Sequence, residues 1–252
     1  MAEPLVHLTI DGTECTCEKG AFLLGVAKKA GIFIPTLCNH PAFEGRGACR
    51  MCIVEVEIRG RKKVVTSCVY PVEQDCIVYT HSEKIDEERA VITSLLAARS
   101  PESPRIAQLA QFYHAPSTSR FVTLENEKCI VCGLCMQACE SLGTGAISLV
   151  DRGTSKKVDT PYSNPSKDCI GCLSCANVCP TDAIAFTEDG TTRHIWGRDF
   201  ELVHCACCGE VMGTPEMLAK AARETGEEPA TLCDACKKEK IGEDLREIYH
   251  RV

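Results

Sequence analysis

The N-terminal third of the chain has a hydrophobic and polar pattern typical of strands packed around one short helix. Val6, Leu8 and Ile10 alternate with polar positions, and the Asp-Gly pair after them is a strong hairpin signal. The expected elements are strands at 6–10, 13–17, 53–58, 64–67 and 76–80 and a helix at 22–30. Residues 1–81 should therefore form a small α+β domain with the element order of a β-grasp fold.

Helical spacing dominates the middle of the chain. Residues 83–99 place apolar side chains on one side of a helix that Pro101 would end, and residues 105–113 predict a second short helix. We therefore expect a helical connector over 82–120. Residues 151–168 are rich in Ser, Lys and Pro, which predicts an exposed loop.

A separate C-terminal module is expected over residues 197–252. Residues 215–225 predict a helix with proline in its first turn. Residues 237–252 predict a terminal helix with an apolar stripe along one side. The stripe consists of Ile241, Leu245, Ile248, Tyr249 and Val252.

Cysteine is the unusual component of the composition, since 20 of the 252 residues are cysteines. The chain is several times longer than the small secreted domains that depend on disulfides. Its first residues lack the basic start and apolar core of a signal peptide, and no apolar run is long enough to span a membrane. We therefore expect a cytoplasmic protein whose thiolates bind metal. The net charge is −7 without a basic stripe, which argues against nucleic-acid binding.

Two copies of one cysteine motif lie between residues 121 and 190. Cys129-x2-Cys132-x2-Cys135-x3-Cys139 is repeated as Cys169-x2-Cys172-x2-Cys175-x3-Cys179-Pro180, the spacing of bacterial dicluster ferredoxins. Three closely spaced cysteines wrap one cubane, and the fourth points to the other cubane. We therefore expect a 2[4Fe–4S] ferredoxin domain over 121–190 rather than a pair of zinc sites. The expected ligand sets are Cys129, Cys132, Cys135 and Cys179 for one cluster and Cys139, Cys169, Cys172 and Cys175 for the other.

A different motif, Cys38-x10-Cys49-x2-Cys52-x15-Cys68, follows the predicted helix of the N-terminal domain. Plant-type [2Fe–2S] proteins have C-x4-C-x2-C and a distant fourth cysteine, so the first interval is longer here. Gly45, Gly47 and Ala48 are small residues that let a loop wind round a cluster. The spacing favours a [2Fe–2S] site and leaves a zinc site open as the alternative.

Three segments around these cysteines resemble a known family. The segments at 35–41, 47–52 and 67–72 are similar to the N-terminal [2Fe–2S] domain of the largest peripheral subunit of respiratory complex I. The same domain occurs in the diaphorase small subunit of NAD(P)-linked hydrogenases and in iron-only hydrogenases. The resemblance covers roughly residues 1–190, and it implies the order [2Fe–2S] domain, helical connector, dicluster domain. The [2Fe–2S] ligands that it implies are Cys38, Cys49, Cys52 and Cys68.

The chain departs from that family in the connector. Those relatives usually carry a further cluster, held by one His and three Cys, between their two ferredoxin domains. Here no cysteine lies between Cys76 and Cys129, and only His81 and His114 could act as ligands. We expect that cluster to be absent, so that the electron route either bypasses it or joins neighbouring clusters directly.

The C-terminal module contains two CxxC pairs. Cys205-x2-Cys208 and Cys233-x2-Cys236 are spaced like the two knuckles of a tetrathiolate site. Zinc is favoured, with a further [4Fe–4S] cluster as the main alternative and free thiols as another, because four thiolates suit both metals. Cys207 could replace Cys208 only by breaking the CxxC spacing. The cysteines expected to be buried without a metal role are Cys15, Cys17, Cys76 and Cys207.

These features predict an electron-transfer subunit with no catalytic residues of its own. Each thiolate-bound cluster exchanges one electron, and the chain has no G-x-G-x-x-G dinucleotide motif. The resemblance implies two partners, a flavin subunit that oxidises NAD(P)H and a [NiFe] hydrogenase, in one version electron-bifurcating. An NAD(P)-linked formate dehydrogenase is the alternative to the hydrogenase. A zinc or iron–sulfur adaptor, a redox sensor and a free ferredoxin are alternatives from other classes.

Overall fold

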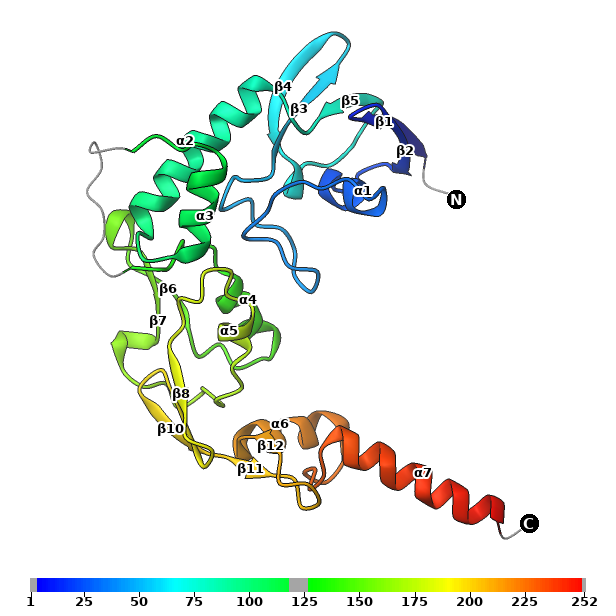
Figure 1. Ribbon diagram of the computed structural model, residues 1–252, viewed down its shortest axis with the longest axis vertical. Helices are drawn as coiled ribbons and strands as arrows, with labels where there is room; N and C mark the ends of the chain where they lie inside the picture. Colours follow the sequence, from blue (N-terminus) through cyan, green and yellow to red (C-terminus); the bar gives the residue numbers. More distant parts are fainter. Residues whose placement is uncertain (1–3, 118–126, 251–252) are drawn as a thin grey trace.

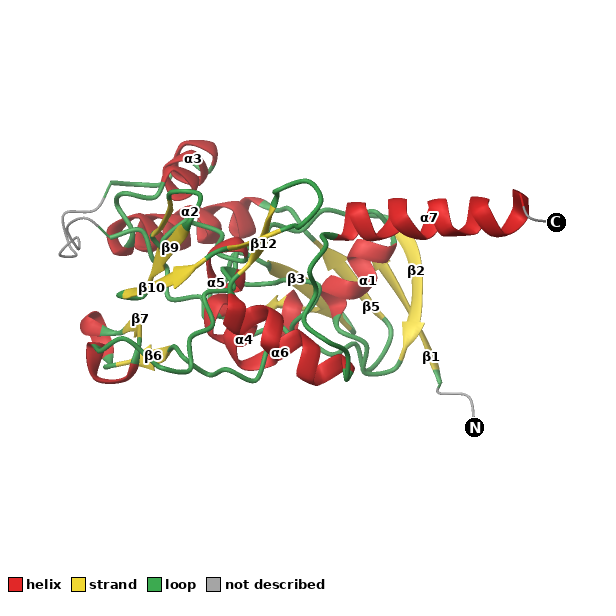
Figure 2. Ribbon diagram, turned by 90° about the horizontal axis from the view of Figure 1, so that it is seen from below, coloured by secondary structure: helices red, strands yellow, loops and turns green. Residues whose placement is uncertain are grey.

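The computed structural model describes residues 4–117 and 127–250. Figure 1 shows the chain as a series of modules: an N-terminal sheet, two helices, the cysteine-rich region and a protruding C-terminal helix. Figure 2 shows both helices and strands, so the predicted α+β class is confirmed. The expected boundary between connector and dicluster domain, at residues 120 and 121, lies outside the described residues, as does Val252.

The N-terminal module is a five-stranded sheet with the order β2-β1-β5-β3-β4 and one helix, α1 (Leu23–Lys29). β1 runs parallel to β5, and the other neighbouring strands pair antiparallel. This is the β-grasp arrangement that the order of the elements predicts. The strands are β1 (Leu5–Ile10), β2 (Thr13–Glu18), β3 (Ile53–Ile58), β4 (Arg61–Thr66) and β5 (Cys76–Tyr79).

One turn of this sheet is shorter than the sequence predicts. β4 begins at Arg61 rather than at Val64, because the hairpin closes through Arg59 and Gly60 alone. Both turn residues have positive φ angles, 50° and 74°, which suits the tight two-residue turn between antiparallel strands. The pairing of β4 with β3 therefore extends to Arg61, which lies opposite Ile58.

The core of this module lies between the sheet and α1. Leu8 and Ile10 face inward from β1, and Leu23 from α1 packs against the same core. Cys52 and Cys68, two of the predicted cluster ligands, belong to it as well. The buried side chains of the sheet come from β1, β3 and β5, whereas β2 and β4 are mostly exposed or partly buried. The N-terminal cluster site is therefore part of the domain core rather than an addition to its surface.

Two helices form the connector, α2 (Glu83–Arg99) and α3 (Pro104–Phe112). Their ranges agree with the predicted ones within one residue. Ser82 and Ser103 act as N-caps, since their hydroxyl groups accept hydrogen bonds from the Ile85 and Ile106 N–H groups at 3.2 and 3.4 Å. The caps explain why each helix begins where the sequence pattern places it.

The segment 151–168 contains more structure than the sequence predicts. Within it β7 (Lys157–Asp159) pairs with β6 (Ser148–Val150), and Val158 lies opposite Leu149. Short 3-10 turns lie on both sides of β7, at η2 (Gly153–Ser155) and η3 (Pro161–Ser163). The strand has one apolar residue, too few for a periodic signal, so the expectation of a plain loop was wrong at this point. Most of the segment is exposed, as predicted.

The cysteine-rich region and the C-terminal part are built from short elements. α4 (Leu134–Ser141) and α5 (Ser174–Asn177) overlap the two cysteine runs. α6 (Pro215–Thr225) occupies its predicted range with Thr214 as N-cap. α7 (Asp234–His250) begins before the predicted position 237, because the Lys237 N–H already donates to the Cys233 carbonyl at 2.9 Å. The strands form one sheet of β8 (Phe186–Glu188), β9 (Thr192–Ile195) and β10 (Arg198–Glu201) and one ribbon of β11 (Val203–His204) and β12 (Val211–Gly213).

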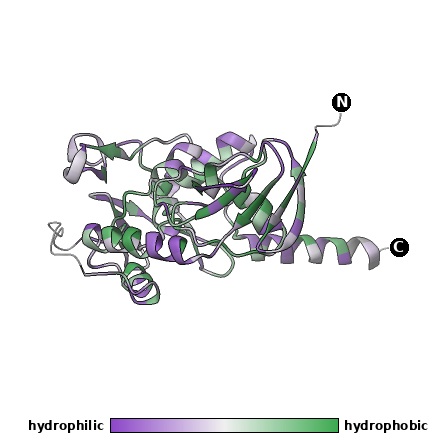
Figure 3. Cartoon of the chain, turned by 90° about the horizontal axis from the view of Figure 1, so that it is seen from above, coloured by the Kyte–Doolittle hydropathy of each residue, from purple (hydrophilic) through white to green (hydrophobic). Residues whose placement is uncertain are grey.

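The apolar stripe predicted for the terminal helix is present but uncovered. Ile241, Leu245 and Tyr249 are 57%, 49% and 79% exposed, and Figure 3 shows α7 with hydrophobic and hydrophilic residues in alternation. The side chain of Ile248 lies outside the described residues. Among the helices that the structure describes, none is both long and apolar enough to cross a membrane.

Candidate metal centres

The four N-terminal cysteines come from a loop, a strand start and a short turn. Cys38 and Cys49 lie in the long loop between α1 and β3, and Cys52 directly precedes β3. Cys68 lies in the 3-10 turn η1 (Ser67–Val69) that follows β4. The exposed fractions of Cys38, Cys49, Cys52 and Cys68 are 0%, 5%, 1% and 3%. The structure therefore buries all four of the predicted [2Fe–2S] ligands.

Strand pairing explains why the distant fourth cysteine reaches this site. β3 and β4 pair so that Ile53 lies opposite Thr66, which places Cys52 and Ser67 next to each other at the end of the hairpin. The Ser67 N–H and hydroxyl donate to the Cys52 carbonyl at 3.1 and 2.8 Å. Cys68 follows Ser67 directly, so the hairpin alone brings two of the four thiols together.

The thiols of this site interact with one another. The Cys49 N–H donates to Cys38 Sγ at 3.3 Å. Hydrogen bonds from Cys49 and then Cys68 lower the pKa of the Cys38 thiol, whereas the hydrogen bond to Cys38 and then burial raise the pKa of Cys49. The sulfurs are thus close enough to compete for protons, and a metal that binds all four must displace those protons.

One glycine shows how tightly the loop closes round this site. A Cβ atom at Gly45 would lie 2.5 Å from the Cys68 carbonyl oxygen and 3.3 Å from the Cys68 Cβ. No side chain fits in that space without moving the backbone. A closely wound loop with four buried thiols and no buried carboxylate in its donor set fits a [2Fe–2S] cluster, whose ligands are thiolates.

Four cysteines of the dicluster region line one cavity. Cys139, Cys169, Cys172 and Cys175 line this small cavity together with apolar side chains that include Ile147, Leu173, Ile195 and Trp196. Three of these cysteines come from the second motif and one from the first, which is the crossed set that the spacing predicts. A cavity lined by four thiols and otherwise mainly by apolar groups fits a thiolate-bound cubane.

The other predicted set is brought together in the same crossed way. Burial raises the pKa of the Cys135 thiol to about 12, and the charges of Cys132, Cys129, Cys175 and Cys179 contribute. Burial also raises the pKa of Cys132 to about 11, again with a contribution from Cys179. Cys179 therefore lies beside the first motif, although it belongs to the second in sequence. The short helices α4 and α5 that carry or precede the fourth cysteines pack against each other and account for this exchange.

Backbone groups hydrogen-bond to the sulfurs of both crossing cysteines. The Ala146 N–H donates to Cys139 Sγ at 3.2 Å, and the Ala183 N–H donates to Cys179 Sγ at 3.3 Å. These bonds stabilise negative charge on the thiolate sulfur. The fourth cysteine of each motif thus accepts a backbone hydrogen bond.

Residues beyond the second motif hold its loop from outside. Trp196 Nε1 donates to Cys175 Sγ at 3.5 Å, and the Arg198 guanidinium donates to the Cys169 carbonyl at 2.7 Å. The Thr214 hydroxyl donates to the Ile170 carbonyl at 2.5 Å. None of these supporting residues stands out in the sequence, because each acts on the loop through distant strands and caps rather than through a motif.

The N-terminal site and the first cubane site share one buried apolar cluster. This cluster contains Cys38 and Cys49 from the N-terminal loop and Cys132 from the first motif, and Ile106 of α3 and Ile130 pack with them. The loop also touches the first motif directly, since a Cβ at Gly133 would lie 3.2 Å from the Arg46 guanidinium. The sequence left two electron routes open, a bypass and a direct approach of neighbouring clusters. This packing agrees with direct approach of the N-terminal site and the first cubane site.

A buried arginine that no sequence motif marks lies behind the N-terminal site. Arg89 of α2 is fully buried and donates through Nε to the Met51 carbonyl at 3.2 Å and through Nη2 to the Ile53 carbonyl at 2.8 Å. These two carbonyls flank Cys52. Burial lowers the pKa of Arg89, and the nearby charges of Tyr113, Asp86 and Cys52 oppose that shift. In sequence Arg89 is one of many charged residues on a helix, so sequence reasoning missed it.

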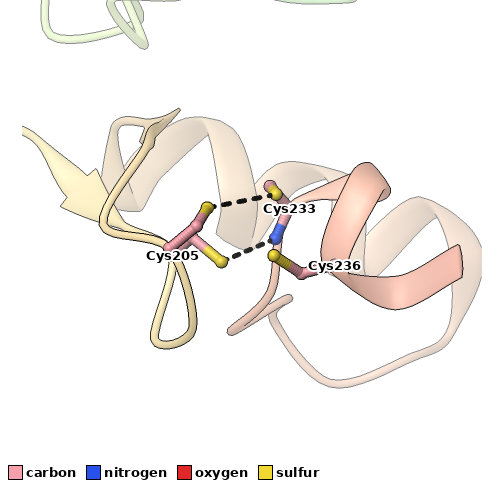
Figure 4. A group of neighbouring side chains, drawn as sticks. Cys205, Cys233 and Cys236 are labelled. Atoms are coloured by element: carbon pink, nitrogen blue, oxygen red, sulfur yellow. Dashed lines mark hydrogen bonds between the residues drawn. The ribbon is translucent and has the colours of Figure 1, made fainter. Parts of the chain in front are cut away.

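The C-terminal CxxC pairs meet in one group of four thiols. Cys205 follows β11, and Cys233 directly precedes α7. The Sγ atoms of Cys205, Cys208, Cys233 and Cys236 all lie within 4.8 Å of one another. Figure 4 shows Cys205 facing Cys233 and Cys236 across this group, and the Cys233 N–H donates to Cys205 Sγ at 3.3 Å. The structure thus assembles the tetrathiolate group that the spacing predicts, and it does not itself identify the metal.

The four cysteines without an assigned role differ in burial. Cys76 is buried, and Cys15 and Cys17 are partly buried against the N-terminal core. Cys207 is exposed, so the expectation that it is a buried apolar residue was wrong. Its two neighbours in the knuckle explain this, because the chain turns Cys205 and Cys208 toward the group of four and leaves the residue between them at the surface.

Comparison with known proteins supports both cluster domains. Residues 3–83 match the family model described as a 2Fe-2S iron-sulfur cluster binding domain, and residues 128–183 match a 4Fe-4S dicluster domain. One subunit of the NADH-quinone oxidoreductase from Mycobacterium bovis is 30% identical over 236 residues, covering 80% of this chain and 28% of that protein. The HndD subunit of the NADP-reducing hydrogenase from Solidesulfovibrio fructosivorans is 28% identical, covering 90% of this chain and 43% of that protein.

A solved structure extends the similarity to the fold. A chain in the crystal structure of an NAD+-reducing [NiFe]-hydrogenase in the H2-reduced state matches with a TM-score of 0.60 and 26% identity, covering 71% of this chain and 86% of that one. The present chain spans less than half the length of both curated relatives. It resembles the iron–sulfur electron-transfer subunits of NAD(P)-linked hydrogenases and part of the related NADH-quinone oxidoreductase subunit, with a [2Fe–2S] domain followed by a 4Fe–4S dicluster domain.

Proposed function

We propose that this chain is the electron-relay subunit of an NAD(P)-linked oxidoreductase complex and carries no catalytic residues of its own. When bound, each iron–sulfur cluster accepts and donates one electron at a time. The proposed [2Fe–2S] ligands are Cys38, Cys49, Cys52 and Cys68. The proposed cubane ligands are Cys129, Cys132, Cys135 and Cys179 for the proximal site and Cys139, Cys169, Cys172 and Cys175 for the distal site.

The observation that carries the proposal is the shared apolar cluster between the first two sites. Cys38 and Cys49 pack in the same buried group as Cys132, without a separate domain between them. The connector contributes Ile106 to this group instead of further cysteine ligands. The two proposed thiolate sites thus adjoin the same buried apolar cluster, which supports passage of electrons from one site to the next.

Helix α4 connects the distal cubane site to the proximal one. α4 carries Cys135 and Cys139, which belong to the two different cubane sets. The crossing therefore couples the two cubane sites through one short helix, and a displacement of α4 would move ligands of both. We therefore propose that electrons pass between the N-terminal site and the distal cubane site by way of the proximal one.

The proposed partners follow from the relatives. One is a flavin-containing subunit that oxidises NAD(P)H, and the other is the catalytic part of a [NiFe] hydrogenase, with electron bifurcation as one version. The printed names of two matches support a hydrogenase, since one is an NADP-reducing and the other an NAD+-reducing enzyme. A formate dehydrogenase as catalytic partner is the alternative.

Electron paramagnetic resonance of the full-length chain tests the relay. We expect the dithionite-reduced protein to show one [2Fe–2S] signal and two [4Fe–4S] signals, with magnetic coupling between the first two sites. Cys38→Ser should remove the [2Fe–2S] signal and leave both [4Fe–4S] signals. A reduced protein without a [2Fe–2S] signal, or with clusters that no physiological donor reduces, would favour a structural adaptor instead.

Purification of the intact complex tests the proposed partners. A tag on this chain should recover a flavin subunit and a hydrogenase subunit from the native source, and the complex should reduce NAD(P)+ with hydrogen. Reduction with formate and not with hydrogen would assign the chain to a formate dehydrogenase. Recovery of the chain alone, active as a free carrier, would contradict a subunit role.

A further inference from the structure

We infer that the C-terminal module binds a single zinc ion through Cys205, Cys208, Cys233 and Cys236, and not a further cluster. The four Sγ atoms lie within 4.8 Å of one another, and the Sγ atoms of Cys208 and Cys233 are 3.7 Å apart. Zinc–sulfur bonds of about 2.3 Å in a tetrahedron place the ligand sulfurs about 3.8 Å apart. The spacing of these thiols therefore suits one ion at their centre.

A cubane requires a wider arrangement. Each of its four thiolates binds a different iron, so an iron–iron edge separates the ligand sulfurs in addition to two iron–sulfur bonds. The dicluster cysteines of the same chain can be compared with the C-terminal group. Within residues 4–117 and 127–250, the eight dicluster cysteines form no group of three or more whose ligand atoms converge as closely as those of the C-terminal group. The difference separates the C-terminal site from the two cubane sites.

The local backbone supports a closed knuckle. The Cys205 N–H donates to the Glu210 carbonyl at 2.8 Å, and the Gly209 N–H donates to the Cys205 carbonyl at 3.0 Å. Gly209 has a φ of +74°, a conformation that residues other than glycine seldom adopt. The Cys233 N–H donates to Cys205 Sγ across the site at 3.3 Å. Hydrogen bonds thus shape the first knuckle and join it to the second.

Exposure and affinity favour zinc over a single iron. Cys208 is exposed and Cys233 is partly exposed, so water reaches the site. A redox-active iron at an exposed position would be open to oxidation, whereas zinc has no redox chemistry. Thiolate sites also bind Zn²⁺ more tightly than Fe²⁺. We infer that the ion joins the β11–β12 knuckle to the start of α7, and that the electron relay ends at the distal cubane site.

Metal analysis of the full-length protein, expressed with both metals available, tests the inference. We expect about one zinc and about ten irons per chain. Cys236→Ser should lose the zinc and keep all of the iron. Cys207→Ser is the matched control, because Cys207 lies in the same knuckle but outside the group of four, and it should keep both metals. X-ray absorption at the zinc edge should show four sulfur neighbours at about 2.3 Å.

Any other metal content would contradict the zinc site, and each alternative site has its own metal content. About four extra irons that disappear with Cys236→Ser would show a third cubane, and one extra iron would show a mononuclear iron site. No change in any metal with Cys236→Ser would show free thiols. Because the three relay signals are measured separately by electron paramagnetic resonance, failure of the zinc assignment is distinguishable from failure of the proposed function.

A second inference comes from Arg89, and it rests on the proposed [2Fe–2S] ligand set. The structure assigns Arg89 as a positioning residue that supplies positive charge behind this site. Its guanidinium is fully buried, and its Nη1 makes no hydrogen bond among the described residues. The carboxylate of Asp86, 3.7 Å away, is half exposed, and its attraction is weakened by water. A buried cation requires negative charge nearby, and we infer that the proposed thiolate site supplies part of it, because Arg89 contacts the two carbonyls that flank Cys52.

The charge of Arg89 should stabilise the reduced, more negative form of the site. We therefore expect Arg89→Met to lower the midpoint potential of the [2Fe–2S] signal in a redox titration. Arg50→Met is the matched control, because Arg50 adjoins Cys49 but is exposed, so removal of its charge should shift the potential much less. An intact signal with an unshifted potential would contradict the role. If Arg89→Met loses the signal, Arg89→Lys decides: recovery near the wild-type potential supports the charge, and no recovery contradicts it.

Discussion

The N-terminal and C-terminal cysteine sites each have four thiols, but they differ in what surrounds them. Cys38, Cys49, Cys52 and Cys68 are all at most 5% exposed and belong to two hydrophobic clusters of the protein. In the C-terminal group Cys208 is exposed, and none of the four cysteines belongs to a hydrophobic cluster of the described residues. The first site is part of the core, whereas the second closes a surface knuckle.

This difference in burial is what we expect if the N-terminal site is a relay centre and the C-terminal site holds a structural ion. A relay site gains from exclusion of water, because its potential depends on burial and on hydrogen bonds to sulfur. A structural ion needs only its ligands, since the metal–thiolate bonds themselves close the chain. Four cysteines can therefore serve either purpose, and their surroundings favour one or the other.

The largest expected effect is the loss of a core ligand. Cys49→Ser should abolish the [2Fe–2S] signal and lower the free energy of unfolding of the N-terminal module by about 3 kcal/mol or more, because it leaves a hydroxyl and unbound thiols in the core. Cys208→Ser should lose only the C-terminal ion. Thermal unfolding followed by circular dichroism and visible absorption checks both. Equal destabilisation by the two variants would remove the contrast between the sites.

Next in size is overcrowding of the N-terminal loop. Gly45→Ala places a Cβ 2.5 Å from the Cys68 carbonyl oxygen, so we expect a loss of about 3 kcal/mol and poor cluster incorporation, measured by denaturant unfolding and iron content. Gly25→Ala is the matched control. Gly25 lies in α1 with open space around its Cβ position, and alanine there should raise stability by up to about 1 kcal/mol. A stable, fully loaded Gly45→Ala protein would refute the tight closure.

A smaller effect is expected where the C-terminal part supports the distal loop. Thr214→Val removes both the N-cap of α6 and the hydrogen bond to the Ile170 carbonyl, so a loss of about 1–2 kcal/mol is expected. Hydrogen exchange should accelerate around 169–172. Thr225→Val, near the exposed end of α6, should stay within about 0.5 kcal/mol of wild type. Similar exchange in both variants would mean that Thr214 does not support the loop.

The smallest expected effect is on the midpoint potential of the distal cubane. Trp196→Phe removes the hydrogen bond from Nε1 to Cys175 Sγ and keeps an apolar ring. Hydrogen bonds to ligand sulfur favour the reduced cluster, so the distal cubane should become slightly harder to reduce. A redox titration that follows both [4Fe–4S] signals checks this, and the proximal signal serves as the internal control. A shift of the proximal signal alone would contradict the assignment of Cys175 to the distal site.

Much of the fold followed from local patterns. The strand alternation around Leu8, the serine caps of α2 and α3, and the proline at the start of α6 act over a few residues, so they can be recognised without tertiary information. The pattern failed at β7, where one apolar residue pairs with a neighbour that belongs to another segment. It also misplaced the start of β4, because the two-residue turn depends on positive φ angles rather than on hydrophobicity.

The supporting residues of the sites could not be predicted in the same way. Arg89 reaches the carbonyls beside Cys52 from a helix more than thirty residues away, and Thr214 reaches Ile170 from a different module. Such contacts carry no sequence signature, since any Arg or Thr on a helix or cap looks the same locally. The burial of the four cysteines without an assigned role could not be predicted from the sequence either, because Cys76 is buried while Cys207 is exposed.

By itself, the sequence determined which thiols group together, because metal ligation imposes spacings that recur along the chain, as in Cys129 to Cys139 and Cys169 to Cys179. The tertiary structure decided how those groups relate. It placed Cys38 beside Cys132 in one apolar cluster, and it brought the C-terminal sulfurs within 4.8 Å of one another. Distances between sulfurs and burial of charges depend on packing between distant segments, and spacing along the chain does not specify that packing.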